Sequence, residues 1–232
     1  MAKSRKRGKA KEPQIISLAA FKGGVGKTTT AIHLATYLGE IGSTLLIDGD
    51  QNRSALDWVE RGGADLYPFK VVDADDPGDM DEYEFIVIDT PARPDAEDLT
   101  ALAENSSLLV VPTKPDALDL GVALSQARYM NDRGIKNYRI LLTQATPPGR
   151  VQKQAGEFKN QSIWASSLTI EILESFREED IPIFSAHTRL QRAIHQRAAL
   201  EGKSLNLLGK SGQVAWIYYE WVGSELLESL KR

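Results

Sequence analysis

Apolar runs alternate with segments of helical periodicity along this chain. The apolar runs are largely continuous, as is typical of parallel strands that helices cover on both faces. The intervening segments repeat apolar residues every three to four positions, which indicates helices with one buried face. This order predicts an α/β fold with a mostly parallel twisted sheet wrapped by helices.

These patterns give the expected elements. We expect strands at residues 15–21, 44–48, 85–89, 108–112, 139–143 and 181–184, with a further short strand at 69–72. We expect helices at residues 27–41, 54–61, 95–104, 116–133, 169–179, 190–201 and 213–231. The polar segment 145–166 begins Ala-Thr-Pro-Pro-Gly and is expected to be a loop with room for one helix.

A glycine-rich segment joins the first expected strand to the first expected helix. Residues 22–29 read Lys-Gly-Gly-Val-Gly-Lys-Thr-Thr. Backbone N–H groups and the helix dipole at such a turn favour a bound anion, and glycines let the backbone approach it closely. The pattern predicts a phosphate-binding loop in which Lys27 reaches the terminal phosphates and the Thr28 hydroxyl binds Mg²⁺. The general form G-x-x-x-x-G-K-[ST] requires Gly at position 21, where this chain has Phe21, followed by an additional Lys22.

This departure resembles the deviant Walker A loop, K-G-G-x-G-K-[TS]-T, of the ParA/MinD ATPases. The resemblance implies a P-loop NTPase fold of the deviant Walker type, with residues 13–232 as a single ATPase domain after a basic flexible tail at 1–12. It also implies ATP and Mg²⁺ as ligands and a homodimer that forms with ATP. In that dimer Lys22 touches the partner's nucleotide, while Lys27 binds phosphate in its own subunit. The implied nucleotide-binding loop residues are Gly23, Gly24, Val25, Gly26, Lys27, Thr28 and Thr29.

Two carboxylates separated by one residue end the expected strand 44–48. Side-chain alternation would place Asp48 and Asp50 on the same side, although the strand ends here and leaves the geometry open. The segment is similar to the family's D-x-D-P-Q motif. By that resemblance Asp48 helps to hold Mg²⁺ indirectly and Asp50 orients or polarises the attacking water. Gln51-Asn52 stand where the family usually has Pro-Gln, which leaves the role of Gln51 open.

The remaining candidate nucleotide residues follow other strands. Asp89 ends the apolar run 85–89, where a carboxylate can accept a hydrogen bond from a Mg²⁺-bound water near Thr28. By resemblance Pro112 and Thr113 lie along the dimer interface and near the base. Thr143-Gln144 stand where the family contacts adenine; ordinary turn chemistry is the alternative for both segments. The expected catalytic set is therefore Lys22, Lys27 and Asp50, and the expected metal set is Thr28, Asp48 and Asp89.

Basic residues concentrate at two places. Residues 1–12 carry six basic side chains and one acid, a net +5, while the rest of the chain carries 22 basic and 31 acidic residues, a net −9. The tail suits a contact with a polyanion or simply solubilises the chain. Arg189, Arg192 and Arg197 are spaced to share part of a helical surface. By resemblance to ParA-type proteins they bind nonspecific DNA; a solvated helix face is the alternative.

Several function classes are excluded or disfavoured. With no Cys there is no disulfide framework, thiolate zinc site or iron–sulfur cluster. The three histidines lack metal-ligand spacing, so we expect core or surface positions for them. No apolar run approaches bilayer length and no signal core precedes the domain, which predicts a cytoplasmic location. The last helix carries glutamates on its polar face, which favours packing on the domain and argues against a membrane partner.

The resemblance implies a small, nucleoid-associated ParA-type partition ATPase. Its ATP-bound sandwich dimer would bind nonspecific DNA, and a ParB-like centromere-binding partner would stimulate a weak ATPase to move plasmid or chromosome cargo. One alternative is a MinD-like regulator recruited to a membrane. Another is a ParA-like positioner of protein cargo such as carboxysomes. A third is a metabolic P-loop enzyme of the dethiobiotin-synthetase kind.

Overall fold

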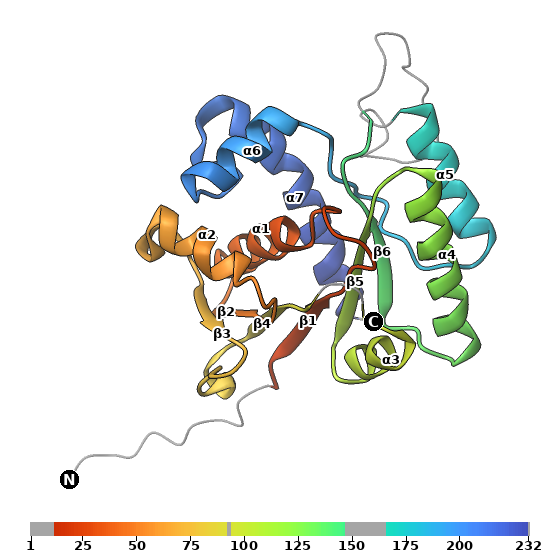
Figure 1. The fold of residues 1–232 in the computed structure, drawn as a ribbon, viewed down its shortest axis with the longest axis horizontal. Coiled ribbons are helices and arrows are strands. Elements are labelled where there is room, and N and C mark those ends of the chain that lie inside the picture. Colours follow the sequence, from red (N-terminus) through yellow and green to blue (C-terminus); the bar gives the residue numbers. More distant parts are fainter. Residues whose placement is uncertain (1–11, 92–93, 147–165, 232) are drawn as a thin grey trace.

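The computed structural model describes residues 12–91, 94–146 and 166–231, which form a central sheet between two layers of helices (Figure 1). All six strands of the sheet run parallel, in the order β3-β2-β4-β1-β5-β6. The α/β, parallel-sheet prediction is therefore confirmed. The strands are β1 (Gln14–Leu18), β2 (Thr44–Asp48), β3 (Lys70–Asp73), β4 (Phe85–Asp89), β5 (Leu108–Thr113) and β6 (Tyr138–Leu142).

Side-chain alternation assigns the helices to the two faces of the sheet. One face packs Ile16, Leu18, Leu46 and Val87 against the first layer of helices. This layer contains α1 (Lys27–Gly39), α2 (Ser54–Gly62), α6 (Arg192–Glu201) and α7 (Gly209–Ser229). On the opposite face, positions of β5 and β6 such as Val111 and Ile140 pack against a second layer of helices. This layer contains α3 (Ala96–Glu104), α4 (Ala117–Asp132) and α5 (Ser167–Glu178). Short 3₁₀ turns lie at η1 (Ala64–Leu66), η2 (Met80–Glu82) and η4 (Leu205–Leu207).

The expected strand at residues 181–184 is wrong, because this segment makes only an isolated parallel bridge between Ile183 and Ile140. Pro182 lacks a backbone N–H, so the segment can donate to β6 only from the residues around it. The Ile140 N–H donates to the Pro182 carbonyl, and the Phe184 N–H donates back to the Ile140 carbonyl, each at 2.9 Å. The segment therefore runs along the edge of β6 without extending the sheet. The additional strand expected at 69–72 is present as β3.

The helix expected from residue 190 begins at Arg192 instead. Before it, Arg189 makes a parallel bridge with Ala145, and the Leu190 N–H donates to the Ala145 carbonyl at 2.9 Å. Arg189 therefore belongs to the extended segment beside β6, and the prediction of a shared helical surface fails for it. The last helix begins at Gly209 rather than residue 213. The tail and most of the 145–166 segment lie outside the described residues.

The last helix packs on the domain, as its sequence pattern predicts, and the structure places it against the phosphate-loop helix α1. Tyr219 on α7 stacks on His33 of α1 with ring centroids 4.5 Å apart. His33 Nδ1 donates to the Thr29 carbonyl at 2.6 Å, and Nε2 accepts from the Leu205 N–H at 3.2 Å. Because its imidazole is buried, the pKa of His33 falls to about 3 and the ring stays neutral. Within the described ranges, no helix is both long and apolar enough to cross a membrane.

Candidate nucleotide site

The phosphate loop leads from β1 into α1 at the carboxyl edge of the sheet (Figure 1). Gly24 and Gly26 have φ angles of 76° and 91°, a conformation that residues with a Cβ rarely adopt. Gly26 stands at the N-cap position of α1, and its carbonyl accepts the Thr30 N–H at 2.8 Å. Gly23 and Gly24 are exposed. The loop thus offers backbone N–H groups at a helix N-terminus, the setting that suits a phosphate.

Lys27 is buried at the centre of the site between two carboxylates. Its Nζ lies 2.5 Å from Asp89 Oδ1 and 3.7 Å from Asp50 Oδ2. The loop, β2 and β4 therefore bring these three predicted residues together. A lysine at this position is placed to exchange a carboxylate partner for phosphate oxygens.

Asp89 has one oxygen committed to Lys27 and one oxygen without a partner. Its Oδ2 is buried and accepts no hydrogen bond from the described protein atoms. Burial raises the pKa of Asp89, while the charge of Lys27 and its hydrogen bond to this carboxylate oppose that rise. An orphaned carboxylate oxygen beside the Thr28 hydroxyl fits a hydrated Mg²⁺, which proteins typically hold through one or two such groups together with substrate phosphates. Among the described residues, no group of three or more His, Cys, Asp or Glu side chains is arranged to hold a metal ion.

The Asp48 carboxylate accepts hydrogen bonds from backbone N–H groups, which the sequence did not indicate. Its Oδ2 accepts the N–H groups of Ala55 and Leu56 at 2.8 and 3.0 Å, which satisfies donors in the first turn of α2. Its Oδ1 accepts the Asp50 N–H at 3.1 Å. This buried carboxylate therefore ties β2 to α2 and fixes the turn that carries Asp50. Its role toward Mg²⁺ stays a prediction.

Asp50 faces the loop from that turn. Its Oδ1 accepts the backbone N–H of Asn52 at 3.0 Å and the Asn52 side-chain amide at 2.9 Å. The backbone hydrogen bond is the largest influence that lowers the pKa of Asp50, and the charge of Lys27 acts in the same direction. Asp50 is therefore held as a carboxylate, able to accept a hydrogen bond from water.

Lys22 is engaged within its own chain. Its Nζ lies 2.5 Å from Asp119 Oδ1, on the first turn of α4. Asp119 is only 7% exposed, whereas the Lys22 side chain is 40% exposed. The sequence did not indicate Asp119, because an acid in the first turn of a helix is explained by the helix dipole alone.

The loop is braced from behind by the ends of β5 and β6. The Thr143 hydroxyl donates to the Val25 carbonyl at 2.6 Å and lies 3.1 Å from the Thr113 carbonyl. Gln144, with a φ of 54°, donates from Nε2 to the Gly24 carbonyl at 2.9 Å. Pro112 and Thr113 lie beneath the loop beside Lys22 and Val25. Thr143 and Gln144 thus bind the backbone of the loop. The adenine contact that the resemblance implies for them stays a prediction.

A cavity of about 160 Å³ opens beside the loop. Gly26 and Thr29 line it at the start of α1. Thr143, Arg189 and Arg192 line it as well. Such a cavity, next to a phosphate loop, is placed to take the nucleoside part of a nucleotide. Its other lining residues are Gln144, Thr188, Leu190, Gln191, His195, Gln196 and Tyr219.

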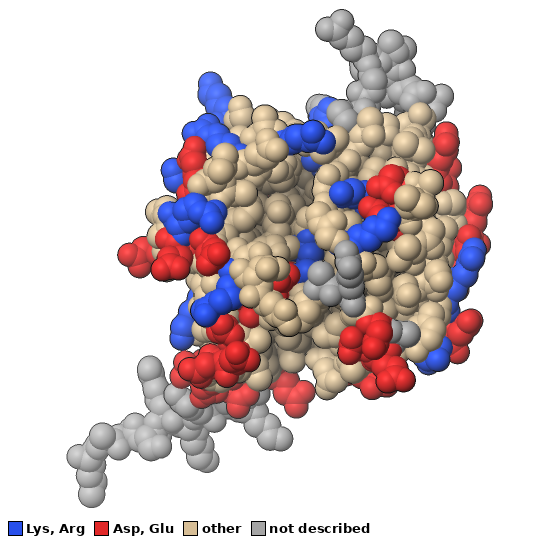
Figure 2. Space-filling model, viewed as in Figure 1, with Lys and Arg blue, Asp and Glu red and all other residues tan. Residues whose placement is uncertain are grey.

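The three arginines expected to bind DNA have different surroundings. Arg189 is half-buried, with Nη1 3.3 Å from the Tyr218 hydroxyl and a buried Nε that lacks a partner. Arg192 is exposed at the first turn of α6. Arg197 is exposed and pairs with Glu201 one turn later at 2.6 Å. Basic side chains lie over α2 and α6 in the upper left of Figure 2. The DNA-binding role of all three stays a prediction.

The chain is similar to characterised proteins over most of its length. The CobQ/CobB/MinD/ParA nucleotide binding domain matches residues 16–161. The chain is 35% identical over 221 residues to the maintenance of carboxysome distribution protein A of Gloeobacter kilaueensis, covering 92% of this chain and 94% of that protein.

Solved structures have the same fold. A plasmid partition protein of Borrelia burgdorferi bound to AMPPNP superposes with a TM-score of 0.64 at 18% identity, covering 94% of this chain and 99% of that one. Apo McdA from Cyanothece gives a TM-score of 0.64 at 16% identity, covering 93% and 100%. The resemblance drawn from the loop is thereby confirmed. The chain belongs to the CobQ/CobB/MinD/ParA family of nucleotide-binding proteins, with the P-loop ATPase fold of ParA and MinD.

Proposed function

We propose that this chain is an ATP-driven positioning ATPase that distributes a protein cargo, of the carboxysome kind, over DNA. The observation that carries the proposal is the similarity to a carboxysome distribution protein along nearly the full length of both chains. The two loop lysines, Lys22 and Lys27, agree with it, because a positioning ATPase needs a dimer that nucleotide controls. This proposal favours the protein-cargo alternative over plasmid or chromosome partition.

ATP binding would exchange partners at both lysines. Lys27 would leave Asp89 for the terminal phosphates, so that the Asp89 carboxylate is free to help hold Mg²⁺ with Thr28. Lys22 would leave Asp119 and reach the nucleotide of the partner subunit. Each lysine thus has a carboxylate partner within its own chain, 2.5 Å away, that competes with the triphosphate. A bound Mg²⁺ would supply charge neutralisation at the phosphates.

Hydrolysis would be slow and stimulated by a partner protein. Asp50 is the group placed to orient a water, because it is a carboxylate held at the edge of the loop by Asn52 and Asp48. Charge that develops on the phosphate oxygens would be stabilised by Lys22 and Lys27. Loss of the γ-phosphate would release Lys22 to Asp119 and reopen the dimer.

The closed dimer would bind nonspecific DNA through Arg189, Arg192 and Arg197. Two subunits double the number of cationic contacts, and counterion release makes DNA affinity depend on that number. DNA binding would therefore depend on nucleotide through dimerisation, without base contacts.

A DNA-shift titration with ATP, ADP and no nucleotide, over a salt series, tests the ATPase switch. We expect binding with ATP alone, loss of binding in Lys27→Ala, and a linear fall of log affinity with log salt. The cargo is tested by imaging a labelled carboxysome shell protein in cells that express the wild type or Lys27→Ala. Even spacing with the wild type and clustering with the variant would support protein cargo.

Partition of a plasmid or chromosome remains the second candidate, because the fold also matches a plasmid partition protein over nearly its whole length. In that case a ParB-like partner bound to a centromere-like DNA site would stimulate hydrolysis. Loss of a plasmid in cells that carry Lys27→Ala, with normally distributed carboxysomes, would favour partition. Liposome sedimentation with ATP addresses the MinD-like alternative, in which vesicles would carry the protein down.

A further inference from the structure

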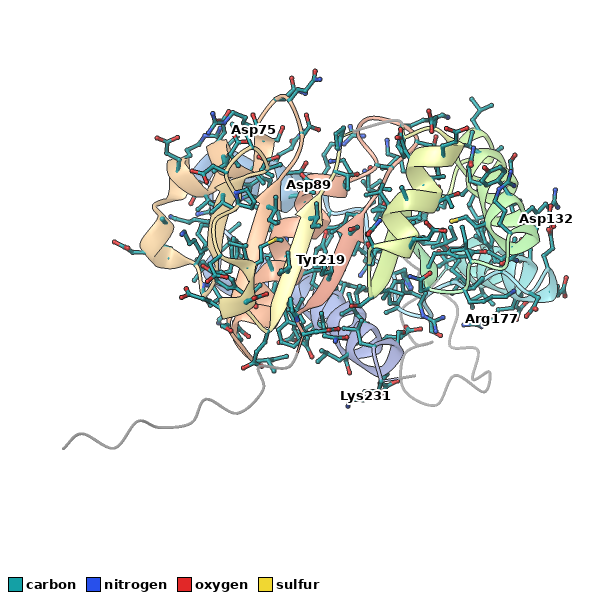
Figure 3. All side chains as sticks on the ribbon, turned by 90° about the horizontal axis from the view of Figure 1, so that it is seen from below. Asp75, Asp89, Asp132, Arg177, Tyr219 and Lys231 are labelled. Atoms are coloured by element: carbon teal, nitrogen blue, oxygen red, sulfur yellow. The ribbon has the colours of Figure 1, made fainter. Side chains whose placement is uncertain are left out.

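One half of the sheet has a face that no helix covers among the described residues. The face bearing α3, α4 and α5 is packed over β5, β6 and Ala19, which follows β1. Over β2, β3 and β4 the same face carries a small separate apolar cluster around Leu45, Ile47 and Ile86. Ile15, Val72 and Ile88 at its margin are only half-buried. The strands of this half lie open to view in Figure 3.

A groove of about 570 Å³ runs along α3 at the border of this open face, and we call it the α3 groove. Its floor includes Ile88, and Ala101 and Leu102 of α3 line one side. Gly49 and Pro91 lie at the carboxyl edge of the sheet, and Ser106 lies at the amino edge. The groove therefore extends from the nucleotide site to the edge at which β1 begins.

Acidic side chains border the groove on both sides. Residues 73–84 contain seven acids and no base, and residues 95–104 contain four acids and no base. Figure 2 shows them as two red groups along the lower part of the molecule, and Figure 3 shows Asp75 at the same end of the sheet as Asp89. The acids are Asp73, Asp75, Asp76, Asp79, Asp81, Glu82 and Glu84 on one side, and Asp95, Glu97, Asp98 and Glu104 on the other.

The N-terminal arm, residues 1–11, leaves the domain at the amino end of this groove. Ile15 accepts a hydrogen bond from the Ser107 N–H at 2.8 Å and donates to the Ser107 hydroxyl at 3.0 Å, directly beside Ser106 of the groove. The arm carries six basic side chains and no acid. Eleven extended residues span at most about 36–40 Å, whereas the nine residues of α3 span only about 14 Å.

We propose that the α3 groove is the docking surface of the chain's own N-terminal arm. The aliphatic stems of the lysines and arginines lie on the apolar floor, and their charged ends pair with the acids on both sides. Docking covers the half-exposed Ile15, Val72 and Ile88 and brings the arm to Pro91, which follows the Asp89 strand of the nucleotide site. Pairing within one chain thus accounts for the charge asymmetry of the sequence, in which a basic tail precedes an acidic body.

Disulfide trapping in the full chain tests this docking, because the chain has no native Cys. Ala10→Cys is combined with Ala101→Cys in the groove, which preserves every charge. The control pair combines Ala10→Cys with Ser224→Cys. Ser224 is an exposed position on α7, on the opposite face of the sheet. Its neighbour Gly223 packs on Tyr37, near the end of α1. We expect the groove pair to form an intramolecular disulfide at least tenfold faster than the control in low salt.

Salt concentration and charge variants test whether ion pairs between the arm and the groove acids speed disulfide formation. At 1 M salt the Debye length falls to about 3 Å, so the advantage of the groove pair should decrease severalfold. Asp75→Asn, Asp76→Asn and Glu97→Gln together should slow groove trapping at least threefold. Neutralising three exposed α5 acids instead, by Glu171→Gln, Glu174→Gln and Glu178→Gln, should leave the rate unchanged.

Equal rates for the two pairs at low salt would overturn the proposal. Predominantly intermolecular disulfides, increasing with protein concentration, would also overturn it and assign the groove to the arm of a second copy. A slower rate in both triple variants alike would attribute the effect to net charge and remove the groove from the explanation.

Discussion

Lys22 and Asp119 form an ion pair within one chain, with Nζ and Oδ1 2.5 Å apart. Lys22 is the residue that the family resemblance assigns to a contact across the dimer. The pair therefore holds this lysine in its own subunit, at the start of α4, until something stronger competes for it. An ion pair with one exposed member is worth roughly 1 kcal/mol or less, which an incoming triphosphate can outweigh.

Replacing Asp119 by Asn should favour the ATP-bound dimer. Each dimer contains two such pairs, so removal of about 1 kcal/mol of competing interaction per subunit corresponds to about a 30-fold tighter dimer. Sedimentation equilibrium with a nonhydrolysable ATP analogue measures this change. Asp132→Asn, at the far end of the same helix, serves as the control. A dimer constant unchanged in Asp119→Asn would contradict the competition.

Replacing Lys27 by Ala should abolish nucleotide binding, because the buried ammonium is the main cation available to the terminal phosphates. The same change leaves Asp89 buried without its counter-charge, so the pKa of Asp89 should rise further and the carboxyl should take up a proton more readily. Isothermal titration with ATP checks the first effect. Retained affinity would refute the phosphate-loop assignment.

Replacing Asp50 by Asn should leave ATP binding in place and lower kcat about 10²–10³-fold, the range expected when a group that orients or activates the nucleophile is lost. The dimer should then persist with ATP bound. Phosphate release measured alongside dimer lifetime separates binding from chemistry. Asp57→Asn on the exposed side of α2 is the matched control, and normal turnover in Asp50→Asn would exclude the proposed role.

Replacing Arg192 by Ala should weaken DNA binding uniformly across sequences. The slope of log affinity against log salt should decrease by about two units for the dimer, because one phosphate contact is lost per subunit. Arg128→Ala, on α4, should have no effect on that slope. An unchanged slope in Arg192→Ala would remove this residue from the DNA contact, and an ATP titration on the same variant shows whether the nucleoside cavity is disturbed.

The free energy of unfolding should decrease as the pH falls, because His33 is buried in its neutral form. Its folded pKa of about 3 lies below the ordinary value of 6.5, so the unfolded chain takes up the proton first as the pH falls. His33 therefore stabilises the fold fully above pH 6.5 and loses this contribution between pH 6.5 and 3, by about 1.4 kcal/mol per unit. Urea titrations at pH 4 to 7 should show a flatter dependence in His33→Gln than in the wild type. Parallel curves would contradict this assignment.

The sequence by itself determined the sheet and the phosphate loop. Buried parallel strands are nearly continuous in apolar residues, and a loop such as residues 22–29 contains its chemistry in a single stretch of chain. It predicted five of the six strands from these runs and named the sixth, β3, as an additional one. It failed at residues 181–184, where an apolar run next to Pro182 lacks the donors that a strand needs.

Only the tertiary structure decided which partners the charged residues take. Asp119 lies 97 positions beyond Lys22, and Gln144 lies 120 positions beyond Gly24, so no local pattern could join either pair. Asp48 and Asp50 share a motif, yet packing assigns one to the α2 backbone and turns the other toward Lys27. A side chain's type and spacing follow from the sequence, whereas its electrostatic partner depends on which strand ends the fold brings to the same edge of the sheet.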